Sequence, residues 1–146
     1  MKWYYAIFFY LSAFYFAGCS SQKNAVTNDI SVLPDKARYM VDNYFKIYHV
    51  SYIISNRHGY YVDLYDDITL RFNKKGEWQE IKTRGIDIPT EVMPYTIVSY
   101  IHENLPENSI ENIKKSSSGS FFVELNNGLK LMFSKTGGFI KVVDED

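Results

Sequence analysis

The chain has 146 residues, a formal net charge of −1 and a single cysteine. Its cations are scattered along the sequence, so no basic face indicates nucleic-acid binding. A lone cysteine excludes an internal disulfide framework, and the length suits one folded domain.

Residues 1–18 form an apolar leader. One early cation, Lys2, precedes an uncharged aromatic and aliphatic run from Trp3 to Ala17. This run is shorter than the roughly 20 apolar residues that span a bilayer, and small residues follow it directly. We therefore interpret residues 1–18 as a secretory signal peptide that takes no part in the fold.

The segment Phe16-Ala17-Gly18-Cys19 resembles a bacterial lipobox, although Phe16 departs from the usual leucine. Small residues before the cysteine give the modifying enzymes access to its thiol and to the adjacent peptide bond. We expect cleavage before Cys19 and lipid on its thiol. The lipid would anchor the N-terminus in a membrane. Two or more acyl chains hold a protein firmly, whereas one binds only marginally. The alternative is a soluble secreted protein with a chance cysteine near its cleavage site.

Residues 19–29 are expected to form a tether between lipid and domain. The stretch from Ser20 to Asn24 is polar and has no apolar period, which is typical of a flexible linker. Ser20 lacks the acidic character linked with retention at the inner membrane, and no acidic run that favours surface export follows Cys19. The expected location is the periplasmic face of the outer membrane, with one folded domain over residues 30–146.

The domain contains an internal duplication. Residues 60–64 (YYVDL) recur 61 positions later as residues 121–125 (FFVEL), and residues 68–72 (ITLRF) recur as 129–133 (LKLMF). Lys74, Gly76 and Trp78 then correspond to Lys135, Gly137 and Phe139. Because turn and core residues repeat in register, two copies of one unit are predicted, at about residues 33–83 and 93–143.

Each copy is expected to begin with a helix. Leu33-Pro34 opens the first copy and Met93-Pro94 the second, and proline suits the first turn of a helix, where no amide donor is needed. Apolar residues then recur at the spacing of one helical face. In the first copy they are Ala37, Met40, Val41, Tyr44, Phe45 and Tyr48, and in the second Ile97, Tyr100, Ile101 and Leu105.

Antiparallel strands are predicted after each helix, because the sequence alternates with period two and is broken by Gly, Asn and Asp. Asn127-Gly128 is a strong hairpin signal of type I′, and Asp66-Asp67 holds the equivalent place in the first copy. The strands are expected near residues 50–55, 60–65, 68–73 and 78–83, and near 110–116, 120–126, 129–134 and 139–144.

The alternation also assigns the two faces of the sheet. One face is apolar and is expected to receive the helices; it carries Tyr60, Val62, Leu64, Ile68, Leu70, Phe72, Phe121, Val123, Leu125, Leu129, Leu131 and Phe133. The candidate binding residues lie on the opposite, mixed face and are Tyr61, Asp63, Arg71, Phe122, Glu124 and Met132. The expected fold is α+β, with one antiparallel sheet of up to eight strands, two helices on one face and the other face open.

Catalytic candidates are weak. His49, His58 and His102 lack metal-ligand spacing, and lipid would occupy Cys19, the only strong nucleophile. The acidic runs 66–67 and 144–146 lack the alternating ligands of a hard-ion site, and residues 116–120 lack the context of a nucleophilic serine. We therefore expect no enzymatic activity, no metal and no cofactor.

The order of these motifs resembles the PepSY-like family described as putative β-lactamase-inhibitor-like. A proline-started helix, strands with Y-x-V-x-L, a turn and L-x-F-x-x-x-G-x-W occur twice over roughly residues 33–143. The resemblance implies two helix-plus-sheet units, an origin typical of Bacteroidetes, export to the periplasm and frequent lipid anchoring. It implies no established biochemical activity.

Three functional hypotheses follow. Aromatic residues, Met and Arg are enriched at protein interfaces, so the open face favours a non-enzymatic periplasmic module that binds a protein or peptide. Strand preference alone also explains Tyr and Phe on a sheet. The family resemblance suggests an inhibitor or regulator of an envelope hydrolase of the protease or β-lactamase type. An enzyme or ligand carrier would need a deep pocket with polar lining between helices and sheet.

Overall fold

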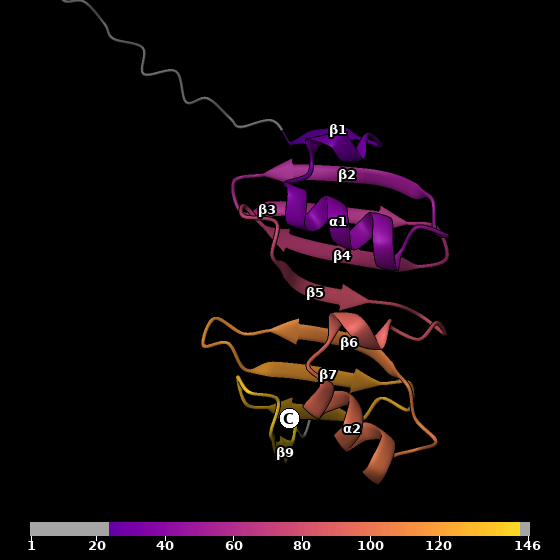
Figure 1. The fold of residues 1–146 in the computed structure, drawn as a ribbon, viewed down its shortest axis with the longest axis vertical. Helices are drawn as coiled ribbons and strands as arrows, with labels where there is room; N and C mark the ends of the chain where they lie inside the picture. Colours follow the sequence, from indigo (N-terminus) through magenta and orange to yellow (C-terminus); the bar gives the residue numbers. More distant parts are fainter. Residues whose placement is uncertain (1–23, 144–146) are drawn as a thin grey trace, which may run out of the picture.

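A computed structural model of the protein describes residues 24–143. This part folds into one antiparallel sheet of nine strands with two α-helices on one face (Figure 1). The strands pair in sequence order, from β1 at one edge to β9 at the other. The predicted α+β fold with an open sheet face is therefore confirmed.

The elements follow the predicted duplication closely. The strands are β1 (Ala25–Thr27), β2 (Val50–Asn56), β3 (Gly59–Leu64), β4 (Ile68–Asn73), β5 (Trp78–Lys82), β6 (Ile110–Lys115), β7 (Phe121–Leu125), β8 (Lys130–Phe133) and β9 (Phe139–Val142). The helices are α1 (Asp35–Tyr44) and α2 (Tyr95–Asn104), and the short 3-10 turns η1 (Ile30–Val32) and η2 (Thr90–Val92) precede them. Within residues 24–143, neither helix is long and apolar enough to cross a membrane. The predicted signal peptide and Cys19 lie outside the described residues.

The ninth strand, β1, lies in the segment expected to be a tether. Ala25–Thr27 pair with Ile53–Ser55 of β2, so the sheet begins before residue 30. Val26 and Thr27 are β-branched and favour strands. Three residues are too few to show a period of two, which is why the sequence pattern missed this strand.

Both helices begin directly after a proline, as predicted. The carbonyl of Pro34 accepts a hydrogen bond from the Arg38 amide at 2.9 Å, and that of Pro94 accepts one from the Ile97 amide at 3.0 Å. Proline fixes φ near the helical value and lacks an amide proton that the first turn could not satisfy. The same device therefore starts the helix in each copy.

The core lies between the helices and the inner face of the sheet. One apolar row crosses eight strands in register and consists of Ile53, Val62, Leu70, Ile81, Ile113, Val123, Leu131 and Val142. All are buried except Val142 on edge strand β9, which is 44% exposed. Ala37 and Phe45 of the first copy and Ile97 of the second cover this row. The predicted inner face is confirmed, and one core serves both copies.

The tight turns only partly follow the prediction. Asp66 and Asp67 both have positive φ, at 66° and 58°, as a type I′ turn requires. Asn127-Gly128 also reverses the chain, but only Gly128 has positive φ there, at 82°. The expected type I′ turn at Asn127-Gly128 is therefore wrong. The Asn127 side chain instead accepts a hydrogen bond from the Leu129 amide at 3.0 Å, which stabilises a different local turn.

The repeated glycine of the motif lets a hairpin turn touch the start of a helix. Gly76, between β4 and β5, has φ of 77°, and a Cβ there would lie 2.8 Å from Pro34 Cβ and 3.1 Å from the Ala37 amide nitrogen. Gly137 repeats this arrangement, with a Cβ position 1.9 Å from Thr96 Oγ1. Glycine is therefore required at both positions by conformation and by space.

We expect Gly76→Ala to destabilise the fold by about 1–3 kcal/mol more than Gly128→Ala, because only the first change also forces side chain against backbone. Gly128 is the matched control, since its φ is 82° and a Cβ there would meet nothing within 4 Å. Urea unfolding of both variants measures the difference. Equal losses of stability would contradict this account of the hairpin–helix contact.

Candidate functional site

The open face of the sheet carries the six binding residues proposed from sequence. Tyr61 lies opposite Arg71, and Phe122 lies opposite Met132. Asp63 and Glu124 occupy the next outward positions on β3 and β7, opposite Thr69 and Lys130. The structure therefore brings all six onto one face, in two equivalent groups of three.

One outward row runs across all nine strands. It consists of Val26, Ile54, Tyr61, Arg71, Glu80, Lys114, Phe122, Met132 and Lys141. Apolar and aromatic side chains occupy β1 to β3 and again β7 and β8, whereas β4 to β6 carry charges. Arg71 Nη1 lies 2.9 Å from Glu80 Oε2 within this charged centre. The row thus places an apolar segment on either side of an ionic strip, and it ends in the charged Lys141 on β9.

Two aromatic residues on the open face of the first copy, Tyr52 and Tyr61, pack against each other. The rings of Tyr52 and Tyr61 stack with centroids 6.1 Å apart and an interplanar angle of 25°. Burial raises the pKa of the Tyr61 phenol, and nearby Tyr52 and Asp63 raise it further. Phe122, the counterpart of Tyr61, is 39% exposed. Both aromatic positions therefore present ring surface on strands that packing holds in place.

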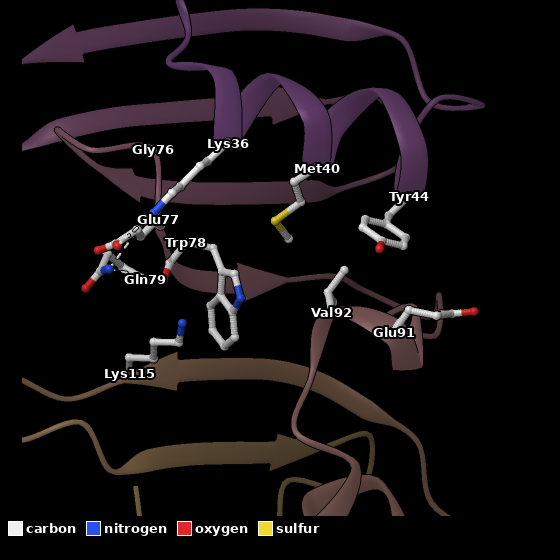
Figure 2. A pocket seen from close by; sticks show the side chains of 10 residues that line it. All are labelled: Lys36, Met40, Tyr44, Gly76, Glu77, Trp78, Gln79, Glu91, Val92 and Lys115. Atoms are coloured by element: carbon white, nitrogen blue, oxygen red, sulfur yellow. Dashed lines mark hydrogen bonds and ion pairs between the residues drawn. The ribbon is translucent and has the colours of Figure 1, made fainter. Parts of the chain in front are cut away.

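A groove of about 580 Å³ lies on the other side of the sheet, between the two copies (Figure 2). It is bounded by α1, the β4–β5 turn, β5, η2 and β6. Its lining residues are Lys36, Met40, Tyr44, Gly76, Glu77, Trp78, Gln79, Glu91, Val92 and Lys115. This site was not predicted from the sequence, where Trp78 counted as a core residue and Lys115 had no assigned role.

The polar groups of the groove are separated along its length. At one end Lys36 Nζ contacts Glu77 Oε1 at 3.2 Å, and Asn73 Nδ2 donates to Glu77 Oε2 at 2.9 Å. The hydrogen bond from Asn73 and the neighbouring Lys36 lower the pKa of the Glu77 carboxyl. Tyr44 and Glu91 lie at the opposite end (Figure 2). The two ends therefore offer different polar partners.

The middle of the groove is apolar, and a lysine borders it. Met40, Trp78 and Val92 line this part (Figure 2). Lys115 Nζ lies 3.6 Å from the centroid of the Trp78 ring, a cation–π contact. Burial lowers the pKa of the Lys115 ammonium, and the Glu77 carboxylate opposes this effect. Within residues 24–143, no oxygen accepts a hydrogen bond from Lys115 Nζ.

The equivalent place in the second copy is filled differently. Tyr100 and Phe139 occupy the positions of Met40 and Trp78, and their rings stack with centroids 4.6 Å apart and an interplanar angle of 10°. The remaining hollow is about 320 Å³, and its lining residues include no lysine or arginine. Of these two equivalent places within residues 24–143, the central groove is the larger and is the one lined by lysines.

The histidines do not assemble into a metal site. His58 Nε2 accepts a hydrogen bond from Arg57 Nε at 2.9 Å, whereas His49, in the loop before β2, and His102, on α2, are both exposed. Among residues 24–143, no group of three or more His, Cys, Asp or Glu side chains is placed to hold a metal ion.

Comparison with known proteins identifies the family. Residues 58–141 match the family described as putative beta-lactamase-inhibitor-like, PepSY-like. The chain belongs to this PepSY-like family. The family resemblance seen in the sequence is therefore confirmed for this PepSY-like protein. A search of curated protein sequences found no match.

Solved structures of Bacteroides proteins share the fold. A putative periplasmic protein of unknown function from Bacteroides vulgatus is 33% identical, with a TM-score of 0.77 over 84% of this chain and 100% of its own. A putative calcium-regulated periplasmic protein from Bacteroides thetaiotaomicron is 21% identical, with a TM-score of 0.75 over 84% and 96%. A second Bacteroides vulgatus protein, described as putative periplasmic, is 22% identical, with a TM-score of 0.74 over 85% and 99%.

These comparisons bear on location more than on activity. All three relatives are described as periplasmic, in agreement with the export expected for the PepSY-like protein. Neither the family description nor the three relatives name an enzymatic reaction. The role of each open-face residue stays a prediction.

We expect Glu77 to stabilise the fold at neutral pH and to lose this contribution in acid. Its pKa is lowered in the folded state, so its stabilisation is complete above the ordinary carboxyl pKa and disappears as pH falls through the folded-state value. Urea unfolding from about pH 7 to about pH 3 should show the difference between wild type and Glu77→Gln shrinking. The exposed Glu107→Gln is the control, and a difference for Glu77→Gln that is constant with pH contradicts the assignment.

Proposed function

We propose that this PepSY-like protein is a non-enzymatic binding module of the cell envelope, which presents the open face of its sheet to a protein or peptide partner. The observation that carries the proposal is the outward row across all nine strands, in which apolar segments on β1–β3 and β7–β8 lie on either side of an ionic centre. Within residues 24–143 both helices lie on the other side of the sheet and leave this face uncovered (Figure 1).

The composition of the row supports contact with a protein. Tyr61 and Phe122 supply aromatic surface at equivalent positions, and Arg71 and Met132 lie opposite them. These residue types carry much of the binding energy at protein interfaces. The centre of the row carries charges, including the Arg71–Glu80 pair, and complementary charges set the orientation of a partner.

The rigidity of the platform also supports binding. The six candidate residues stand on β3, β4, β7 and β8, whose inward residues, such as Val62 and Val123, are buried. The backbone of the face is therefore fixed before a partner arrives, which reduces the entropy cost of association. Strand preference explains aromatic residues one at a time. It does not explain their shared register with Arg71 and Met132.

Crosslinking tests whether a partner meets this face. We expect a photo-reactive benzoyl-phenylalanine at position 122 to give a discrete crosslinked product in native envelopes, and the same group at position 95 to give none. Tyr95, on α2, is 80% exposed and serves as the matched position on the helix side. Equal products from both positions, or none from position 122, would contradict the proposal.

Alanine at Tyr61, Arg71 and Met132 together should abolish the product from position 122 and leave the melting temperature nearly unchanged. The matched control changes Tyr39, Arg38 and Tyr95 to alanine, since these lie on the helices and include two exposed aromatic residues. A captured protease or β-lactamase would favour the inhibitory role, which activity assays with purified protein then measure. Undiminished crosslinking by the open-face variant argues against this surface.

We also propose that lipid on Cys19 holds the module at the envelope, on the periplasmic face of the outer membrane. The apolar leader and the lipobox-like segment before Cys19 support this, as does the periplasmic description of the relatives.

Cys19→Ser should move the protein out of the membrane fraction, or leave its leader uncut, because the acyl acceptor is lost. Mass spectrometry of the native N-terminus should show an acylated Cys19 in the wild type. Ser21→Ala is the control and should keep both the acyl mass and the membrane location. An unmodified wild-type N-terminus would refute lipid anchoring.

A further inference from the structure

We propose that the groove between α1 and η2 binds a ligand in which a carboxylate adjoins an apolar group, the chemistry of a peptide C-terminus. Lys115 would bind the carboxylate, and Trp78, Met40 and Val92 would contact the apolar group. The groove lies on the side of the sheet opposite the open face, so this proposal stands independently of the proposed function.

Lys115 is the first argument, because no oxygen of residues 24–143 accepts a hydrogen bond from its ammonium. A lysine ammonium has three hydrogen-bond donors. Lys115 is partly buried, its Nζ lies 3.6 Å from the centroid of the Trp78 ring, and it donates none of the hydrogen bonds within residues 24–143. Lys115 Nζ keeps contact with solvent, because among residues 24–143 only Asn112 Oδ1 is a fully buried side-chain nitrogen or oxygen without a partner. A ligand carboxylate at this point would replace that water as the acceptor and add a compensating charge.

The nearby Glu77 carboxylate is already occupied. Its Oε1 contacts Lys36 Nζ at 3.2 Å, and its Oε2 accepts the hydrogen bond from Asn73 Nδ2 at 2.9 Å. The same loop holds Glu77 from a second side, since Asn73 Oδ1 accepts the Glu77 amide at 3.0 Å. Both carboxylate oxygens therefore have partners on the α1 side of the groove, and Lys115 remains available to an incoming anion.

The groove also offers a place for an apolar group beside the carboxylate. Trp78 lies beside Lys115, Met40 lies near Trp78, and Val92 of η2 continues the apolar lining (Figure 2). A volume of about 580 Å³ lies within the range of small-ligand sites. The groove is thus the kind of polar-lined pocket between helix and sheet that a ligand carrier needs.

The far end distinguishes a peptide from a simple apolar acid. The Tyr44 hydroxyl and the Glu91 carboxylate lie beyond Val92 (Figure 2). A carboxylate accepts hydrogen bonds from amide or ammonium groups, which a peptide has and a hydrocarbon tail lacks. The polar order along the groove, from cation through apolar wall to acceptor, therefore favours the C-terminal residues of a peptide.

The groove is present beside the first copy, whereas aromatic side chains fill much of the equivalent place in the second copy. In the second copy Tyr100 stacks on Phe139 and occupies the corresponding space. In the first copy Met40 is smaller in width and flexible, which suits a wall that adapts to a ligand. The cation comes from β6 of the second copy, so the complete set of groups exists only where the two copies meet.

Trp78 fluorescence gives a direct test. The chain has two tryptophans, and Trp3 lies in the predicted signal peptide. Trp78 is therefore the single reporter after cleavage, and Trp3→Phe makes it so in any uncut chain. The probes are N-acetyl-Ala-Leu with a free carboxylate, the same peptide as its C-terminal amide, and octanoate. We expect saturable changes with the free acid and binding of the amide that is weaker by about tenfold or more, since the ionic hydrogen bonds are lost.

Neighbouring lysines provide the matched variants. Lys115→Met should remove the preference for acid over amide, whereas Lys114→Met should retain it, because Lys114 lies on the open face opposite Phe122. Saturable binding of the peptide acid above octanoate supports a peptide source, and the reverse assigns the carboxylate site to fatty acids. No saturable signal with either acid overturns the proposal, as does equal binding of acid and amide or a preference that survives Lys115→Met.

Discussion

The pairing of β5 with β6 is the contact on which the rest of the structure depends. It places Ile81 opposite Ile113, both fully buried, and so joins two helix-plus-strand units through one apolar row. Without this seam each unit would expose a strand edge and part of its inner face. The outward row is continuous only because the seam is in register. The groove, in turn, lies directly above it and takes residues from both copies.

The duplication made the fold predictable, because period-two alternation assigns strand faces and proline marks each helix start. The inner residues Val62 and Val123 and the outward residues Tyr61 and Phe122 lie where this rule places them. β1 escaped the rule because its few residues gain their order from pairing with β2. Tertiary context, rather than local pattern, decides such short edge segments.

The internal duplication predicted the fold but did not predict the groove. Aligning the copies matches Trp78 with Phe139 and leads both to be assigned to the core. Their surroundings differ, because Trp78 has a further strand beside it and Phe139 lies on the edge strand β9. Lys115 reaches Trp78 across the seam between the copies. Sequence comparison of the copies cannot show this contact, since it has no counterpart within a single copy.

The early start of the sheet limits how far from the membrane the domain can meet a partner. β1 fixes the chain from Ala25 onward. If Cys19 is acylated, the linker between the lipid and the sheet is the segment from Cys19 to Ala25, which can span at most roughly 20 Å. The first edge of the sheet would then stay near the lipid surface, and encounters would be confined to a thin layer above the membrane. Such confinement raises the local concentration of partners held in the same layer and excludes those fixed farther away.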